Sequence, residues 1–213
     1  MNESYYHNKS VHYGIAKTRK RKIMELLGNT KGMRVLDIGC ATGYLGAEIR
    51  SRGNYVAGVE ISQQAAREAE KVLDVVYSFD LQQQWPVELQ KKVYDIAVLA
   101  EVLEHVFDPV QVLNNVRDVL GTNGTIIITT PNIMAWHNRV KFLRGQFKYT
   151  DQGTLDFGHI RFFTYAYLKE VLTDSGFKLI GENHIIFPGK LTKLLKRWPS
   201  VFANQFIVKA QKV

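Results

Sequence analysis

The sequence predicts an α/β fold in which helices cover both faces of a mostly parallel β-sheet, and three observations lead to it. The expected strands are continuous apolar runs, which is typical of strands buried on both faces. Along residues 33–130 these runs alternate with segments of helical periodicity, as in a parallel sheet with crossover helices. A chain of 213 residues, 46% of them hydrophobic, can form one such domain with a substantial core.

The first 130 residues contain the regular part of this pattern. Apolar residues at helical spacing predict a helix over residues 15–28, which Gly28 can end. Ser62 can cap a second helix over residues 63–71. The other expected helices cover residues 44–52 and 109–120, and the expected strands are Met33–Ile38, Tyr55–Ile61, a run within Val72–Phe79, Tyr94–Ala100 and Gly124–Thr130.

The alternation breaks after Pro131. Residues 132–163 mix aromatic and basic side chains without clear periodicity, so we expect an irregular insertion there. A helix over residues 164–175 and strands at Phe177–Gly181 and Asn204–Ala210 complete the expected fold. We therefore expect a single domain over residues 1–213, with residues 1–31 as an N-terminal helical cap.

Composition narrows the class of protein. The single cysteine, Cys40, excludes an internal disulfide and a cysteine-rich zinc site. The polar start lacks the pattern of a signal peptide, and no apolar run approaches the roughly 20 residues needed to cross a bilayer. We expect a cytoplasmic protein, and the sequence does not predict its oligomeric state.

The net charge of +8 is unevenly distributed along the chain. Residues 1–31 carry a net charge of +5, residues 32–130 carry −5, and residues 131–213 carry +8. Basic ends around an acidic middle suit an anionic substrate, a nucleic acid or a membrane surface. A solvated basic face explains the same pattern, so charge alone does not select a partner.

A glycine-rich turn follows the first expected strand, in the segment Val35–Gly43 (VLDIGCATG). Glycine in such a turn lets the backbone approach a ligand closely. Glu60 ends the second expected strand, and its carboxylate can accept hydrogen bonds from both ribose hydroxyls of a nucleoside. Because open α/β sheets bind ligands at the carboxyl ends of their strands, the turn and Glu60 predict a nucleoside-containing cofactor.

Two such cofactors compete for this turn. A nicotinamide dinucleotide favours the pattern G-x-G-x-x-G, but Ala41 and Tyr44 occupy the second and third glycine positions here. Asp37 precedes the turn, and its carboxylate would repel a pyrophosphate but attract the cationic amino end of S-adenosylmethionine. The sign of this charge favours S-adenosylmethionine.

The segments VLDIGCATG and GVEIS resemble the signature of class I S-adenosylmethionine-dependent methyltransferases. Further matches follow in the family's order at Phe79–Leu81, Tyr94–Pro109, Arg117–Asn132 and His159–Phe177. The last of these is similar to the MetW-like and ubiquinone-biosynthesis-like branch, and the likeness extends over residues 11–211. It implies a three-layer Rossmann-like sandwich with a mostly parallel seven-stranded sheet and the last strand antiparallel. It also implies that the insertion over residues 132–163 lies on the substrate side.

The resemblance also implies cofactor contacts by position, in the turn and at the carboxyl ends of the next strands. These contacts are Gly39, Cys40, Ala41 and Gly43 around the methionine and ribose, Asp37 on the amino group, Glu60 on the ribose, Asp80 on the adenine between Ile61 and Leu81, and Ala100 and Glu101 near the transferred methyl group.

Candidate catalytic residues lie on the same expected edge. His105, just past the fourth strand, is the first candidate for the general base that a hydroxyl acceptor would need. His159 and Arg161 lie in the insertion, where Arg161 could clamp a carboxylate or phosphate. Tyr13 and Arg19 would close over the cofactor from the amino-terminal side.

Metal ligands are not assigned from the sequence. The resemblance leaves open that Glu104 and His105 help to hold a divalent metal, as in some ubiquinone-branch relatives.

The expected activity is O-methylation of a small polar or anionic metabolite, or of a glycan or lipid-linked intermediate. An RNA methyltransferase is an alternative favoured by the pI near 9.5. However, residues 100–103 read AEVL where methyltransferases of base amino groups carry [DN]-P-P-Y, and the only cysteine lies in the cofactor turn rather than at a nucleophile position. A third alternative is a non-catalytic partner, because MetW-like proteins are associated with an acyltransferase of methionine synthesis.

A peripheral membrane contact is a further expectation. The segments Trp136–Lys148 and Lys190–Trp198 mix basic, aromatic and aliphatic residues, and such segments can lie on an anionic bilayer.

Overall fold

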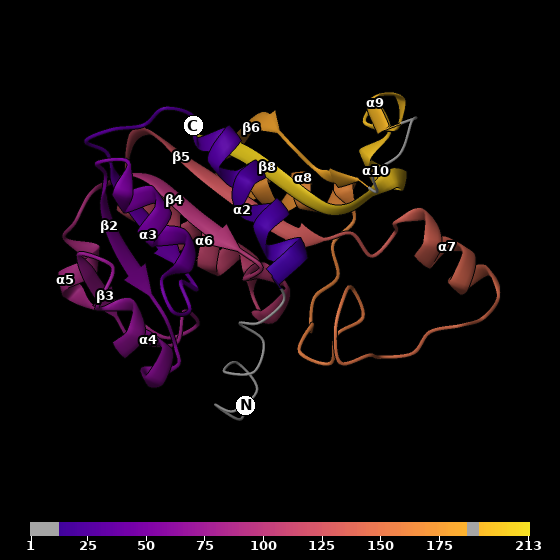
Figure 1. Cartoon of the computed structure of the whole chain (residues 1–213), viewed down its shortest axis with the longest axis horizontal. Coiled ribbons are helices and arrows are strands. Elements are labelled where there is room, and N and C mark those ends of the chain that lie inside the picture. The colour runs from indigo at the N-terminus through magenta and orange to yellow at the C-terminus, as the bar shows by residue number, and fades with distance from the viewer. Residues whose placement is uncertain (1–12, 187–191) are drawn as a thin grey trace.

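The computed structural model describes residues 13–186 and 192–213, and its centre is one twisted sheet (Figure 1). The strand order is β3-β2-β1-β4-β5-β8-β6, and β7 pairs with part of β8 to complete eight strands. The strands are β1 (Arg34–Ile38), β2 (Tyr55–Val59), β3 (Val75–Tyr77), β4 (Tyr94–Ala100), β5 (Leu120–Pro131), β6 (Phe177–Glu182), β7 (Ile185–Ile186) and β8 (Ala203–Lys212).

The direction of the strands confirms the expected architecture. Strands β1 to β5 are parallel to their neighbours, whereas β8 runs antiparallel to both β5 and β6. The two-residue β7 is one strand more than the resemblance implied. Because β1 to β5 share a direction, their carboxyl ends meet at one edge of the sheet, and the turns that leave them face a common region.

Helices cover both faces of the sheet and make it the middle of three layers (Figure 1). One face packs against α2 (Tyr13–Leu27), α3 (Tyr44–Ser51) and α4 (Gln63–Ala69). The other packs against α5 (Val87–Gln90), α6 (Pro109–Val119) and α8 (Tyr165–Asp174). Side chains alternate between the two faces, so that Val35 contributes to the first cluster and Leu36 to the second.

The expectation that residues 132–163 are irregular is wrong in part. Helix α7 (Trp136–Leu143) forms inside this segment. Its pattern was missed because the helix buries the polar Asn138 and exposes Trp136 and Leu143, the reverse of the usual amphipathic arrangement. The other elements that were not predicted are about one turn long, too short for periodicity to show: η2 (Leu103–His105), α5, α9 (Thr192–Leu195) and α10 (Pro199–Phe202).

The N-terminal cap is described from residue 13 onward. Helix α2 packs Ile23, Met24 and Leu27 against the sheet, and the Lys209 ammonium group donates a hydrogen bond to the Leu26 carbonyl at 3.1 Å. The side chain of Tyr13, expected near the cofactor, lies outside the described residues. None of the helices in the described ranges is long and apolar enough to span a membrane.

Candidate cofactor and acceptor site

The turn after β1 is tightly packed and needs glycine at two positions. Gly39 and Gly43 have φ of 70° and 81°, a region that side chains disfavour. A Cβ atom at Gly39 would lie 2.7 Å from Val102 Cγ2, and one at Gly43 would lie 2.7 Å from Val72 Cγ2. Both glycines therefore let neighbouring segments approach the turn closely.

Glu60 connects this turn to the loop after β2. Its Oε2 accepts a hydrogen bond from the Ala41 amide at 2.9 Å, and its Oε1 accepts one from the Ser62 amide at 2.8 Å. The carboxylate is 7% exposed. The bond to Ala41 also holds that residue at φ 48°, a strained conformation for alanine. Since each carboxylate oxygen can accept a second hydrogen bond, Glu60 keeps acceptor capacity for the two hydroxyls of a ribose.

Asp37 is buried beneath the first turn of α3. The pKa of its carboxyl group is raised to about 7, mainly by burial and to a smaller extent by the charge of nearby Glu60, while a hydrogen bond with the Gly46 backbone opposes the rise. A cation placed beside Asp37 would favour the ionised carboxylate and lower this pKa. The buried carboxyl group of Asp37 therefore suits a positively charged partner.

Cys40 is a packing residue in this structure. Its side chain is 5% exposed, and burial raises the pKa of the thiol above its ordinary value. A thiol held in its neutral form is a poor nucleophile. Cys40 therefore contributes shape to the turn, next to the expected ligand, rather than reactivity.

The residues expected around an adenine lie after β2 and β3, next to the turn in the strand order. The Ile61 side chain is 47% exposed and Leu81 is half-buried. Asp80 accepts a hydrogen bond from the Gln82 amide through Oδ1 at 3.0 Å, which shapes the loop after β3. Their adenine contacts stay predictions.

Glu101, after Ala100 at the end of β4, is held by partners from two other segments. Its Oε1 accepts a hydrogen bond from the Thr129 hydroxyl at 2.7 Å, and its Oε2 pairs with the Arg19 guanidinium at 3.1 Å. Arg19 Nε also donates to Gln205 Oε1 at 3.1 Å. Thr129 and Gln205 were not among the sequence-predicted residues. This network joins α2 to the carboxyl edge of the sheet, close to where Arg19 was expected.

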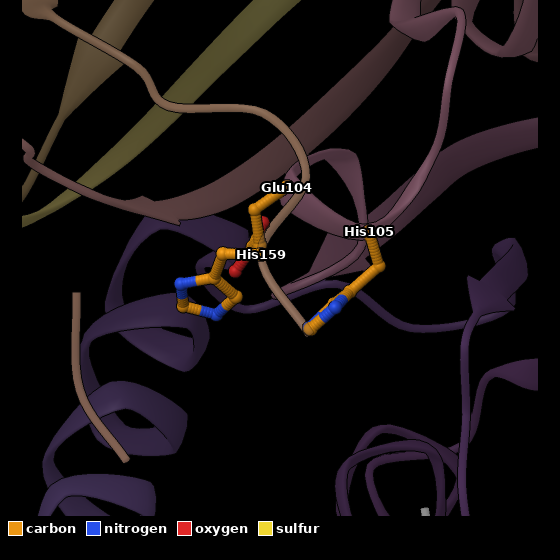
Figure 2. Close-up of side chains that lie close together, drawn as sticks. All are labelled: Glu104, His105 and His159. Atoms are coloured by element: carbon orange, nitrogen blue, oxygen red, sulfur yellow. The ribbon is translucent and has the colours of Figure 1, made fainter. Parts of the chain in front are cut away.

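Glu104, His105 and His159 form a cluster beside this edge (Figure 2). Helix η2 carries the first two, and the end of the insertion carries His159. The Glu104 carbonyl accepts hydrogen bonds from the amides of residues 160 and 161 at 2.9 and 3.1 Å, which fastens the insertion to η2. One ligand atom from each of the three side chains lies within 4.8 Å of the others.

Backbone carbonyls fix the orientation of both imidazoles. His105 Nδ1 lies 2.8 Å from the Gly158 oxygen, and His159 Nδ1 lies 3.0 Å from the Thr154 oxygen. A carbonyl can only accept, so each Nδ1 carries the hydrogen. In the neutral ring the lone pair is then on Nε2, the nitrogen that can act as a base or a metal ligand.

The Glu104 carboxyl group is 1% exposed. Burial raises its pKa well above the ordinary value, the nearby Glu101 charge raises it further, and Arg19 and Thr130 oppose the rise. In the part of the chain that the structure describes, no hydrogen bond of normal geometry reaches either carboxylate oxygen. Burying an ionised carboxyl group without a partner costs free energy. We therefore expect Glu104 to carry a proton or to interact with a cation or a ligand.

The three side chains also fit a divalent metal. Two imidazole nitrogens and a carboxylate oxygen are a donor set that zinc and other first-row divalent metals accept. Both histidines contact a backbone carbonyl oxygen through Nδ1. Histidines that bind a metal through one ring nitrogen usually donate a hydrogen bond of this kind from the other. His159 thus adds a third donor to the Glu104 and His105 pair that the sequence left open.

Arg161 braces the insertion against the loop after η2. Its Nε donates a hydrogen bond to the Phe107 carbonyl at 2.9 Å, and Nη2 donates to the same oxygen. The sequence indicated a clamp for an anionic acceptor. The structure gives this side chain a positioning contact, and the clamp stays a prediction.

Comparison with known families decides the class of protein. The model of a family described as a methyltransferase domain matches residues 11–182. The chain belongs to this methyltransferase domain family. The resemblance to class I S-adenosylmethionine-dependent methyltransferases expected from the sequence is thereby confirmed.

Curated relatives of this methyltransferase-domain chain are named ubiquinone biosynthesis O-methyltransferase. The protein from Histophilus somni is 28% identical over 152 residues, covering 66% of this chain and 63% of the relative. The protein from Aeromonas salmonicida is 31% identical over 114 residues, covering 52% and 48%. The chain thus spans between about half and two thirds of the length of these relatives.

Solved methyltransferases share the fold of this methyltransferase domain at low identity. A magnesium protoporphyrin IX methyltransferase from Synechocystis, solved with S-adenosylhomocysteine, has a TM-score of 0.66 at 19% identity and covers 94% of this chain and 84% of its own. A methyltransferase from Aquifex aeolicus has a TM-score of 0.66 at 15% identity and covers all of both chains. These likenesses show the fold.

Proposed function

We propose that this chain transfers a methyl group from S-adenosylmethionine to an oxygen atom of a small polar or anionic acceptor, either a metabolite or a glycan or lipid-linked intermediate. One observation carries the proposal. The glycine turn tied to Glu60 and the cluster of His105, His159 and Glu104 stand on one edge of one sheet. A cofactor site thus lies next to groups that can accept a proton. The names of the curated relatives support an oxygen acceptor.

Residues of the turn and of the loops after β2 and β3 hold the cofactor. Glu60 accepts the ribose hydroxyls, Asp37 faces the cationic amino group, and Asp80 with Ile61 and Leu81 surrounds the adenine. When bound, S-adenosylmethionine supplies an electrophilic methyl group on a sulfonium. Holding the acceptor oxygen in line with that group lowers the barrier by several kcal/mol, on the order expected for pre-oriented reactants.

The sequence offered His105 as the first candidate for the general base. We assign this role to His159 instead, because its side chain is buried beside the buried Glu104 carboxyl group. The Nε2 atom of His159 takes the proton of the acceptor hydroxyl, while Nδ1–H stays on the Thr154 carbonyl. An ionised Glu104 carboxylate beside it would stabilise the imidazolium formed in this way. His105 occupies the same cluster and either shares the proton or orients the acceptor.

A divalent metal held by Glu104, His105 and His159 is the alternative use of the same cluster. Bound there, it would act as a Lewis acid on the acceptor oxygen and favour its deprotonated form.

Transfer of the labelled methyl group from S-adenosylmethionine to a panel of acceptors tests the proposal. We expect label in phenolic or alcoholic hydroxyl compounds, more strongly in those that carry a carboxylate or phosphate. Label in RNA instead, together with salt-sensitive RNA binding, would support the RNA alternative and contradict the proposal. Cofactor binding without turnover on any acceptor, together with co-purification of a second protein, would support a regulatory role.

A further inference from the structure

Helix α7 exposes its apolar side and buries its polar one. Trp136, Val140 and Leu143 are 47%, 37% and 89% exposed, whereas Asn138 is 3% exposed. At 3.6 residues per turn, the three apolar residues form a stripe only about 60° wide, and Asn138 lies on the opposite side. Soluble proteins usually arrange a surface helix the other way round. The exposed stripe is therefore available to contact an apolar environment outside the chain.

Basic residues predominate in the sequence around this stripe. Residues 132–150 contain four basic residues and no acidic residue. Lys141, Arg144 and Lys148 are exposed. The remaining one, Arg139, donates to the Met134 and Ser200 carbonyls at 2.7 and 3.3 Å. The exposed basic residues thus lie in the same segment as the exposed apolar side chains, a combination that complements a negatively charged apolar surface.

A second segment of the same character adjoins the first. The Arg139 bond to Ser200 ties α7 to α10, and Asn132 donates to the Ala203 carbonyl at 2.8 Å. Just before α10, Leu194 and Trp198 are 47% and 51% exposed, and Lys196 and Arg197 are exposed between them. In Figure 1, α7, α9 and α10 lie at one end of the molecule, opposite α4 and α5.

A chain of aromatic rings leads from α7 toward the histidine cluster. Phe142 stacks on Phe147 with centroids 5.7 Å apart, Phe147 meets Tyr149 at 5.5 Å, and Tyr149 stacks on Phe157 at 5.9 Å. Phe157 is 62% exposed and precedes His159 by two residues. The exposed apolar surface is therefore continuous with the acceptor side of the site.

We propose that α7 and the segment from Leu194 to α10, named here the α7–α10 surface, dock on an anionic lipid bilayer. Trp136, Val140, Leu143 and Trp198 enter the boundary between headgroups and acyl chains, and the lysines and arginines contact lipid phosphates. An anionic bilayer matches both the apolar stripe and the predominance of basic residues in these segments. The inference goes beyond the proposed methyl transfer, because it depends on the surface and not on the identity of the acceptor.

Sedimentation of the full chain with vesicles tests this inference. We expect binding to vesicles of phosphatidylcholine mixed with phosphatidylglycerol, decreasing with salt, and little binding to phosphatidylcholine alone. Leu143→Glu should weaken the partition by roughly tenfold or more, because a buried leucine is lost and a charge of the wrong sign is added. Lys141→Ala and Arg144→Ala should each weaken it by about fivefold.

Matched controls lie at the opposite end of the molecule. Val87→Glu makes the same type of change at a side chain 52% exposed on α5, and Lys91→Ala and Lys92→Ala remove equivalent charges. All three should bind vesicles like the native chain. S-adenosylmethionine binding by every variant reports an intact fold, so a failure on vesicles leaves the proposed methyl transfer standing.

Absence of binding to the mixed vesicles would overturn the inference, as would equal losses in the Val87→Glu and Leu143→Glu variants. A native dimer that Leu143→Glu dissociates, without lipid binding, would instead assign the α7–α10 surface to a second copy of the chain.

Discussion

Replacing His159 with alanine is expected to lower the turnover rate by about 10²- to 10⁴-fold, the usual contribution of a general base. S-adenosylmethionine affinity should stay close to native, because His159 is not among the residues assigned to the cofactor. The His159→Asn variant should lose as much activity, since an asparagine amide can still donate to the Thr154 carbonyl but cannot accept the proton at neutral pH. Single-turnover rates with saturating cofactor measure the effect.

Comparison with His105→Ala separates the roles within the cluster. A smaller loss in His105→Ala than in His159→Ala would support His159 as the base, and full activity in both variants would remove the base from the mechanism. Recovery of activity in His159→Asn would show that the side chain only positions the insertion. The metal alternative has its own readout: the native protein would hold a stoichiometric divalent metal by elemental analysis, and both alanine variants would lose it.

Replacing Asp37 with asparagine is expected to stabilise the free protein while weakening cofactor binding. Burial raises the pKa of this carboxyl to about 7 in the folded state, against about 4 in the unfolded chain. The folded state therefore binds the proton more tightly, and Asp37 costs stability progressively as pH rises from 4 toward 7. Asparagine is neutral throughout, so the gain should be absent near pH 4 and on the order of a few kcal/mol near pH 8.

The affinity for the cofactor should depend on pH in the opposite direction to the stability of the free protein. A cation beside Asp37 favours the ionised carboxylate, so native affinity for S-adenosylmethionine should rise as pH increases through about 7. The Asp37→Asn variant should bind at least tenfold more weakly, as roughly expected for the loss of a charge-assisted hydrogen bond, and without this pH dependence. Thermal unfolding and calorimetry across pH measure both effects. A variant less stable than native near pH 8 would contradict the assigned burial cost.

The sequence predicted the sheet and the cofactor turn because both depend on local patterns. Continuous apolar runs located strands β1 to β5, and the positions of Gly39 and Gly43 matched a turn that needs positive φ. Placement of Glu60 at the end of β2 followed from the same pattern. Its two backbone partners could not be read from the sequence, since they depend on how the loops after β1 and β2 approach each other.

The acceptor side was harder to predict because its contacts join distant segments. His105 and His159 are far apart in the sequence. They are brought together by bonds between the two segments, such as those from residues 160 and 161 to the Glu104 carbonyl and the contact of His105 with the Gly158 carbonyl. Arg161 could be located but not its partner, the Phe107 carbonyl. Helix α7 was missed because its outward apolar stripe and inward asparagine contradict the usual rule for surface helices.

Calorimetric binding of S-adenosylmethionine and S-adenosylhomocysteine tests whether the turn and Glu60 form a cofactor site. The native chain is compared with Glu60→Ala and with a control, Glu68→Ala, which changes an exposed carboxylate on α4. We expect micromolar binding by the native chain and the control. Glu60→Ala should bind about a hundredfold more weakly, because two hydrogen bonds to a charged group are lost. Native protein that binds neither compound, although its thermal unfolding transition shows that it is folded, would contradict the assignment of this cofactor site.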